Sequence, residues 1–111
     1  MLVHQIQQHI DLHVDEPLRI SQLAARFGLS ERSLSRRFAA ATGRGPRAYL
    51  QHARIQHAVR LLETVSDAID QIRSRAGYTG PAAFRRVFKQ ATGLSPSRYR
   101  ETYGLRTGPA K

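Results

Sequence analysis

Apolar residues recur at helical spacing in the later half of the chain. The set consists of Ala83, Phe84, Val87, Phe88 and Ala91. Spacings of three and four residues place such a set on one side of an α-helix. Proline suits the first turn of a helix and glycine its C-terminal cap, so Pro81 and Gly93 mark the two ends. The pattern predicts a helix with one buried side, while Arg85, Arg86 and Lys89 lie at its polar positions.

A shorter helical segment precedes this one and predicts a helix-turn-helix. Ile69 and Ile72 form its apolar side, and Gly77 follows, with Tyr78 as an apolar plug after it. Glycine readily adopts the backbone conformation that a tight turn between helices requires. The second helix of such a pair, with arginine and lysine on its exposed side, is a candidate for insertion into the major groove of DNA.

The same pattern occurs about 50 residues earlier in the chain. Residues 20–28 align with 69–77 at an offset of 49, and residues 34–49 align with 84–99 at an offset of 50. Identical pairs include Ile20/Ile69, Gln22/Gln71, Arg26/Arg75, Gly28/Gly77, Arg36/Arg86, Phe38/Phe88, Thr42/Thr92, Gly43/Gly93, Pro46/Pro96 and Tyr49/Tyr99. Two copies are too few for a solenoid, so the repeat predicts two helix-turn-helix units in one all-α domain.

The remaining apolar stripes complete the expected organisation. They predict a first helix over 2–14, a helix of 20–26, and a helix ending at Thr42, with Ser30 as its N-cap and Leu34, Phe38 and Ala41 facing inward. The longest helix, 46–64, is apolar on more than one side, which is typical of a rigid spacer between two subdomains. We expect a first unit over about 1–45, a second over about 65–103, and a disordered tail over 104–111.

Charge is the strongest compositional signal. The net charge is +10, and between Leu18 and Leu62 the only acidic residue is Glu31. Between Gln71 and Arg100 there is no acidic residue at all. Such segregation predicts a basic face suited to a polyanion. A membrane surface is a poorer fit, because the basic residues lie on short packed helices without a large exposed apolar face.

Residue types that would support other functions are missing or badly placed. The chain has no cysteine, which excludes disulfides and thiolate metal sites. His9 and His13 are four residues apart, a spacing that can hold a metal, but no third ligand accompanies them, so we expect surface histidines and no cofactor. No apolar run is long enough to span a membrane and no signal peptide is present, so a cytoplasmic protein is expected.

Four motifs together resemble one known family. They are DEPL at 15–18, QLAARFGLSERSLSRRF at 22–38, RIQHAVRLLET at 54–64 and GLSPSRYR at 93–100. In combination they resemble the DNA-binding domain of AraC/XylS transcription regulators, over about residues 1–103. The resemblance implies seven helices and two recognition helices that read adjacent major-groove segments. The second signature is most similar to that of regulators that carry this domain after an amidotransferase-like domain.

The resemblance also implies the residues of the DNA interface. Matching motif positions assign base contacts to Arg32, Ser35, Arg36, Pro81, Ala82, Arg85 and Arg86. Pro81 and Ala82 offer no hydrogen bond through their side chains and would contact thymine methyl groups. Phosphate contacts are expected from Ser30, Arg37, Arg47, Thr79, Lys89 and Arg98.

The sequence departs from the family pattern at two positions. Arg73 stands where a small residue lets the helices of the unit approach, as Ala24 does in the first unit. Either Arg73 extends outward along the helix surface or the second unit packs more loosely. Arg19 stands where the family often has a capping serine.

The expected function is sequence-specific double-stranded DNA binding in transcription regulation, by an isolated domain that is monomeric. RNA polymerase is a further expected partner if the regulator activates. The alternative is a non-specific architectural nucleic-acid-binding protein. Some DNA-repair alkyltransferases carry the same double motif, but they need a cysteine nucleophile, so we do not expect an enzyme. The start inside the first helix favours a domain excised from a longer regulator over a stand-alone short regulator; both remain open.

Overall fold

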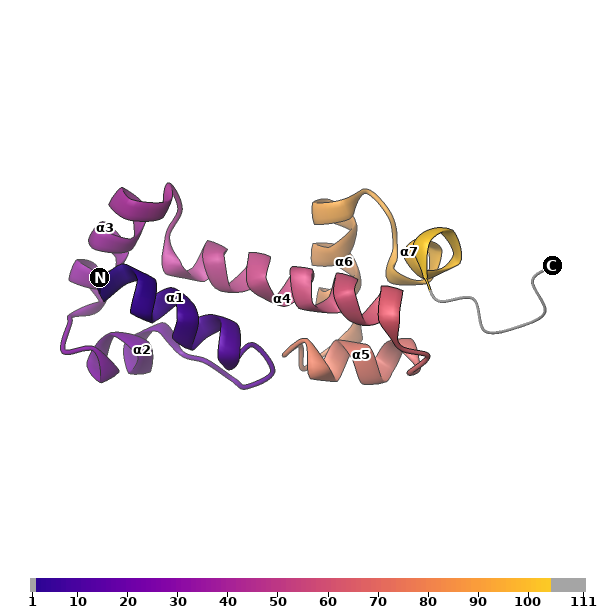
Figure 1. Cartoon of the computed structure of the whole chain (residues 1–111), viewed down its shortest axis with the longest axis horizontal. Helices are drawn as coiled ribbons and strands as arrows, with labels where there is room; N and C mark the ends of the chain where they lie inside the picture. The colour runs from indigo at the N-terminus through magenta and orange to yellow at the C-terminus, as the bar shows by residue number, and fades with distance from the viewer. Residues whose placement is uncertain (1, 105–111) are drawn as a thin grey trace. The chain divides into compact units, whose positions relative to one another are not determined.

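A computed structural model describes residues 2–104 as seven α-helices, with no strand in that range (Figure 1). The helices are α1 (Leu2–Leu12), α2 (Ile20–Arg26), α3 (Glu31–Thr42), α4 (Pro46–Thr64), α5 (Ile69–Arg75), α6 (Pro81–Thr92) and α7 (Pro96–Tyr103). The predicted all-α, seven-helix fold with two helix-turn-helix pairs is confirmed. The pairs are α2–α3 and α5–α6. The predicted disordered tail lies, from residue 105 on, outside the described residues.

The first unit, residues 1–53, contains α1, α2, α3 and the first turns of α4. Its core is a set of aliphatic side chains closed by one phenylalanine: Val3, Ile6, Ile10, Val14, Ile20, Leu23, Ala24, Leu34, Phe38 and Leu50. Leu34 and Phe38 are completely buried, as their place on the predicted inward stripe requires. Burial of such side chains is the main stabilising term for a domain of this size.

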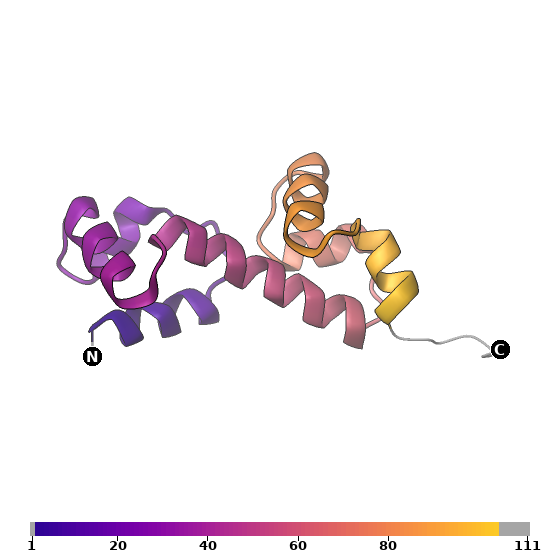
Figure 2. The same ribbon diagram turned by 90° about the horizontal axis from the view of Figure 1, so that it is seen from above.

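The second unit, residues 54–111, contains the rest of α4 together with α5, α6 and α7 (Figure 2). Its core contains Ile55, Ala58, Leu61, Leu62, Ile72, Ala76, Phe84, Val87 and Phe88. The rings of Phe84 and Phe88 lie 5.7 Å apart, and Tyr99 meets Phe88 edge-on at 5.6 Å. The second core is therefore the more aromatic of the two.

Matching turns and caps end the helices of both units. Gly28 and Gly77 have φ angles of 72° and 90°, so both helix-turn-helix turns use the left-handed conformation that glycine adopts without strain. Gly43 and Gly93 cap α3 and α6 in the same conformation. These observations confirm the turns and helix ends predicted from the repeat.

Two details of the predicted helices are wrong. The first helix ends at Leu12, not at residue 14, because its last turn tightens into the hydrogen bond from His13 N to Ile10 O at 3.1 Å. Val14 is nevertheless buried, from the turn that follows. The second detail concerns three alanines predicted to face inward, Ala41, Ala83 and Ala91, which are exposed. Ala41 and Ala91 occupy the last turns of α3 and α6, beyond the buried phenylalanines.

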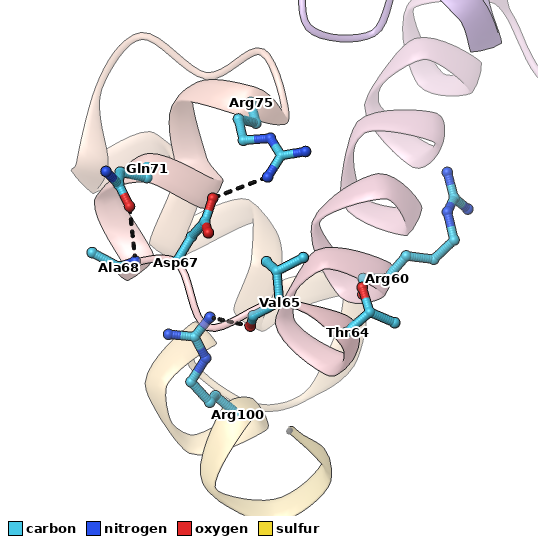
Figure 3. Close-up of polar contacts among 8 residues, drawn as sticks. All are labelled: Arg60, Thr64, Val65, Asp67, Ala68, Gln71, Arg75 and Arg100. Carbon is cyan, nitrogen blue, oxygen red and sulfur yellow. Dashed lines mark hydrogen bonds and ion pairs between the residues drawn. The ribbon is translucent and has the colours of Figure 1, made fainter. Parts of the chain in front are cut away.

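The segment between α4 and α5 is fixed by polar contacts (Figure 3). The Arg100 guanidinium on α7 donates to the carbonyl of Val65 at 3.2 Å. Arg75 donates to the carboxylate of Asp67 at 2.9 Å. The Gln71 amide oxygen accepts from the backbone N–H of Ala68 at 3.1 Å and so caps α5, which has no capping hydroxyl. These bonds define how α5 leaves α4 inside the second unit.

None of the helices that the structure describes is long and apolar enough to cross a lipid bilayer.

Candidate nucleic-acid interface

The outward side of α3 presents arginines at helical spacing. Ser30 caps the helix, its hydroxyl accepting from Ser33 N at 3.1 Å. Because successive residues turn by about 100°, Arg32 and Arg36 lie on one face, opposite the buried Leu34 and Phe38. Both arginines are exposed, as is Ser35 beside them.

The outward side of α6 is built differently at its start. Gly80 is the N-cap, with no side-chain hydrogen bond, and Pro81 is the first helical residue. The helix places Ala82, Arg86 and Lys89 opposite the buried Phe84 and Phe88, and all three are exposed. Arg85 is also exposed, at the edge of this face.

The arginines on these two faces have no acidic partner. Among residues 2–104, no carboxylate forms an ion pair with Arg32, Arg36, Arg85 or Arg86. Carboxylates of the second unit are used elsewhere, Asp67 with Arg75 at 2.9 Å and Asp70 with Arg73 at 2.8 Å. The outward faces of α3 and α6 therefore carry uncompensated positive charge, which attracts a polyanion.

The predicted phosphate-contacting residues are all exposed, at helix starts or on helix surfaces: Ser30, Arg37, Arg47, Thr79, Lys89 and Arg98. The Ser30 oxygen already accepts the cap hydrogen bond, but its own hydrogen remains a donor. Arg98 lies 3.8 Å from the carboxylate of Glu101, and both side chains are exposed. An exposed ion pair contributes little stability, so breaking it to bind a phosphate would cost little free energy. Arg37, Arg47 and Lys89 have no ion pair within residues 2–104.

A tyrosine–carboxylate pair supports each unit, and the sequence analysis missed both. Tyr49 donates to Asp11 at 3.2 Å, and Tyr99 donates to Glu63 at 2.5 Å. The bond to Glu63, then burial, raise the pKa of Tyr99 to about 12. Each tyrosine ring also meets the buried phenylalanine of its unit edge-on, Phe38 of α3 and Phe88 of α6. The identity of Tyr49 and Tyr99 in the repeat was the available signal.

Arg73 resolves one of the two departures from the family pattern. Its side chain is only 14% exposed, so it does not extend outward into solvent. The guanidinium donates to the carbonyl of Tyr78, while Nε donates to Asp70 at 2.8 Å. Arg73 thus braces the α5–α6 turn. The other departure, Arg19, is the N-cap of α2 and makes no side-chain cap bond.

The two histidines of α1 interact with each other. The rings of His9 and His13 stack with centroids 4.1 Å apart, and His13 Nδ1 lies 2.7 Å from the carbonyl of His9. Burial, and then the charge of His13, lower the pKa of His9. Within residues 2–104 no group of three or more potential metal ligands gathers anywhere.

Proteins with similar sequences are described as transcription regulators. An uncharacterized HTH-type transcriptional regulator of Staphylococcus aureus is 37% identical over 98 residues, which is 88% of this chain and 13% of that protein. The MmsAB operon regulatory protein of Pseudomonas aeruginosa is 34% identical over 89 residues, 80% of this chain and 29% of that protein. The chain therefore spans only a small part of the length of these relatives.

Solved structures agree in fold. The C-terminal domain of AraT, a response regulator from Geobacillus stearothermophilus, superposes with a TM-score of 0.92 at 28% identity, over 98% of this chain and 91% of that one. The DNA-binding domain of AdpA, a global transcriptional factor crystallised with a target DNA, gives a TM-score of 0.88 at 35% identity, over 91% of each chain.

The sequence also matches the family described as a helix-turn-helix domain, over residues 23–102. That match includes α3, α6 and both turns. By this match, its relatives and its fold, the chain belongs to the AraC-type helix-turn-helix family of transcription regulators.

Proposed function

We propose that this protein binds double-stranded DNA sequence-specifically, with α3 and α6 as two recognition helices in adjacent major-groove segments. The observation that carries the proposal is the pair of outward faces with uncompensated arginines, each held rigidly by a buried phenylalanine on the opposite side. A helix of this kind fits the major groove, where arginine can form two hydrogen bonds to a guanine.

The residues divide into those that read bases and those that position the domain. Base contacts are assigned to Arg32, Ser35 and Arg36 on α3, and to Pro81, Ala82, Arg85 and Arg86 on α6. Arginines supply the guanine contacts, while the proline and alanine accept thymine methyl groups at no hydrogen-bonding cost. The six phosphate-contacting residues fix register and carry no sequence information.

The AdpA domain supports this assignment by analogy, since it was crystallised with a target DNA and is 35% identical to this chain. By the same analogy we propose that the isolated domain acts as a monomer in transcription control, in the cytoplasm, with RNA polymerase as a partner where the regulator activates.

The experiment has two stages. Selection from random duplex oligonucleotides with the purified chain identifies a preferred sequence. Gel shifts then compare this duplex with a scrambled one at physiological salt. We expect the preferred duplex to bind at least about a thousandfold more tightly. Equal binding of the two duplexes would instead identify a non-specific architectural protein.

Salt dependence tests the docking surface separately. Six to eight phosphate contacts predict a slope of log K against log salt on the order of −5 to −7. A slope shallower than about −2 would show that the basic faces do not dock on DNA.

A further inference from the structure

The first unit contains a basic pocket away from the proposed reading face. It has a volume of about 430 Å³ and is lined by Val3, His4, Gln7, Ala41, Thr42, Arg44, Tyr49 and His52. The lining comes from α1, the end of α3, the loop after it and the second turn of α4. A volume of this order is typical of sites for small organic molecules.

Three basic side chains line this pocket, namely His4, Arg44 and His52. Within residues 2–104, none of the three forms an ion pair with a carboxylate. The Asp11 carboxylate, which lies near, accepts from the Tyr49 hydroxyl at 3.2 Å. An arginine always carries its charge, and each imidazole has an N–H donor in either protonation state. The pocket therefore offers hydrogen-bond donors and positive charge to an anion from solution.

The loop that carries Arg44 is held in a defined conformation. The Thr42 hydroxyl donates to the carbonyl of Phe38 at 2.8 Å and accepts from the backbone N–H of Arg44 at 3.3 Å. The second unit has the same brace, in which Thr92 contacts Phe88 at 2.9 Å and Leu94 at 3.2 Å. The backbone N–H groups of residues 44 and 94 thus donate to the equivalent threonine in each unit.

Their surroundings differ in chemistry. Arg44 corresponds to Leu94 and His52 to Thr102, at the repeat offset of 50. Asp11 and Glu63 are equivalent positions, because each accepts the hydrogen bond of its unit's tyrosine, and they are 52 residues apart. The same offset makes Gln56 the equivalent of His4. All three basic residues of the pocket are therefore replaced by neutral residues in the second unit. The scaffold does not require them, since the second unit folds the same way without them.

The pocket itself is lined by none of the residues assigned to base or phosphate contacts. Arg36 and Thr42 are six residues apart, about 9 Å along the axis of α3. By helical spacing Ala41 lies in line with Leu34 and not with Arg32 and Arg36, although it is exposed at the end of the helix. An apolar groove adjoins the pocket, lined by Leu2, Val3, Ala40 and Ala41 together with Arg37, which is one of the proposed phosphate contacts.

We propose that this pocket binds a small organic anion, a carboxylate or phosphate carried on an apolar body. Its anionic group lies among His4, Arg44 and His52. Its apolar part lies against Val3 and Ala41 and extends toward the adjoining groove. Unlike the DNA contacts, this site exists in one unit only.

The test is a titration followed by amide chemical shifts of the whole chain. The probes are sodium benzoate and inorganic phosphate, with sodium chloride at matched ionic strength as the reference. Saturable benzoate shifts at Val3, Ala41, Thr42 and Tyr49 are expected. Benzoate should bind more tightly than inorganic phosphate, since only benzoate offers an apolar body. Shifts that spread without saturation over the exposed arginines, or equal affinity for the two anions, would overturn the proposal.

Variants copied from the second unit provide the control. Arg44→Leu should weaken benzoate about tenfold, the loss of one charge-assisted hydrogen bond. His52 is exposed, so His52→Thr leaves the core intact, and it should weaken benzoate binding several-fold. Arg26→Leu makes the same charge change outside the pocket and should leave benzoate affinity unchanged. Unchanged affinity in both pocket variants, or equal losses in all three, would rule the site out.

A competition experiment with DNA distinguishes a pocket for a small anion from a pocket that contacts a DNA phosphate. The duplex found by selection should bind without displacing benzoate, and with similar affinity in Arg44→Leu and Arg26→Leu. Competition between the duplex and benzoate, together with a DNA-binding loss confined to Arg44→Leu, would make the pocket a DNA-phosphate contact and overturn the proposal.

Discussion

The two units solve the same packing problem with the same parts. Each has a turn glycine with positive φ, a completely buried phenylalanine in the second helix of its helix-turn-helix pair, and a tyrosine that contacts this ring and a carboxylate. Each also ends that helix with a threonine bonded to the following loop. The repeated features are therefore the core of each unit and the turns that join its helices.

The differences lie where side chains leave the scaffold. The outward face has Arg32 in the first unit and Ala82 in the second, and Ser35 in the first where the second has Arg85. The turn is braced by Arg73 only in the second unit, since the first has Ala24. One scaffold therefore presents two chemically different surfaces.

The largest expected effect concerns the shared core. Phe38→Ala and Phe88→Ala should each lower the free energy of unfolding by about 3–5 kcal/mol, because each removes a completely buried ring. Chemical denaturation measures both. Similar losses would confirm that the two cores are equivalent, whereas a variant with wild-type stability would contradict the assigned helix faces.

The next effect concerns the outward arginines. Arg36→Ala and Arg86→Ala should each cost about 1–3 kcal/mol of specific binding, if each side chain contacts a guanine. The melting temperature should stay unchanged, since both residues are exposed. Gel shifts on duplexes with single base changes measure the effect. Wild-type affinity together with wild-type base preference would refute the assignment for that unit.

A smaller effect should be confined to the second unit. Arg73→Ala removes the donor to the Tyr78 carbonyl and should lower the melting temperature, while Arg75→Ala, which removes only a more exposed pair, should lower it less. The hydrogen bond and charge of Arg73 hold the pKa of Asp70 below 3.8. This contribution is complete above pH 3.8 and is lost as the pH falls through the lower folded value. Equal melting temperatures for the two variants would show that the brace is dispensable.

The smallest effect appears at alkaline pH. Tyr99 has a pKa of about 12 against an ordinary value of 10.0, so its neutral hydroxyl stabilises the fold fully below pH 10. That stabilisation is lost as the pH rises from 10 toward 12. Tyr99→Phe should remove this part of the alkaline unfolding, and spectrophotometric titration should lose the tyrosine that ionises last. A normal titration of all tyrosines would contradict the bond to Glu63.

The large core residues were predicted correctly from the sequence, because large apolar side chains at helical spacing are stable only when they are buried. Leu34, Phe38, Phe84 and Phe88 are buried as expected. Alanine gave the errors. Ala41 and Ala91 fall near the stripe by periodicity but occupy the last turn of their helices, and a small side chain is tolerated there whether covered or not.

Polar contacts between distant segments could not be predicted. The bond from Tyr49 to Asp11 joins residues 38 positions apart, and nothing in a local pattern pairs them. Arg73 likewise fitted either of two arrangements until its partners Asp70 and Tyr78 were placed. The DNA-contacting residues remain predictions, whose exposure on the helix surfaces the structure shows.

We propose that both units read DNA in one complex, through different outward residues and hence on a non-palindromic site. The direct measurement is footprinting and gel shift on the selected duplex and on one with about five base pairs inserted between its two protected segments. The insertion rotates one segment by about half a helical turn. If α4, one uninterrupted helix of 19 residues, acts as a spacer, specific affinity should fall to that of scrambled DNA. Unchanged affinity for the expanded duplex would show that the two units do not read DNA together.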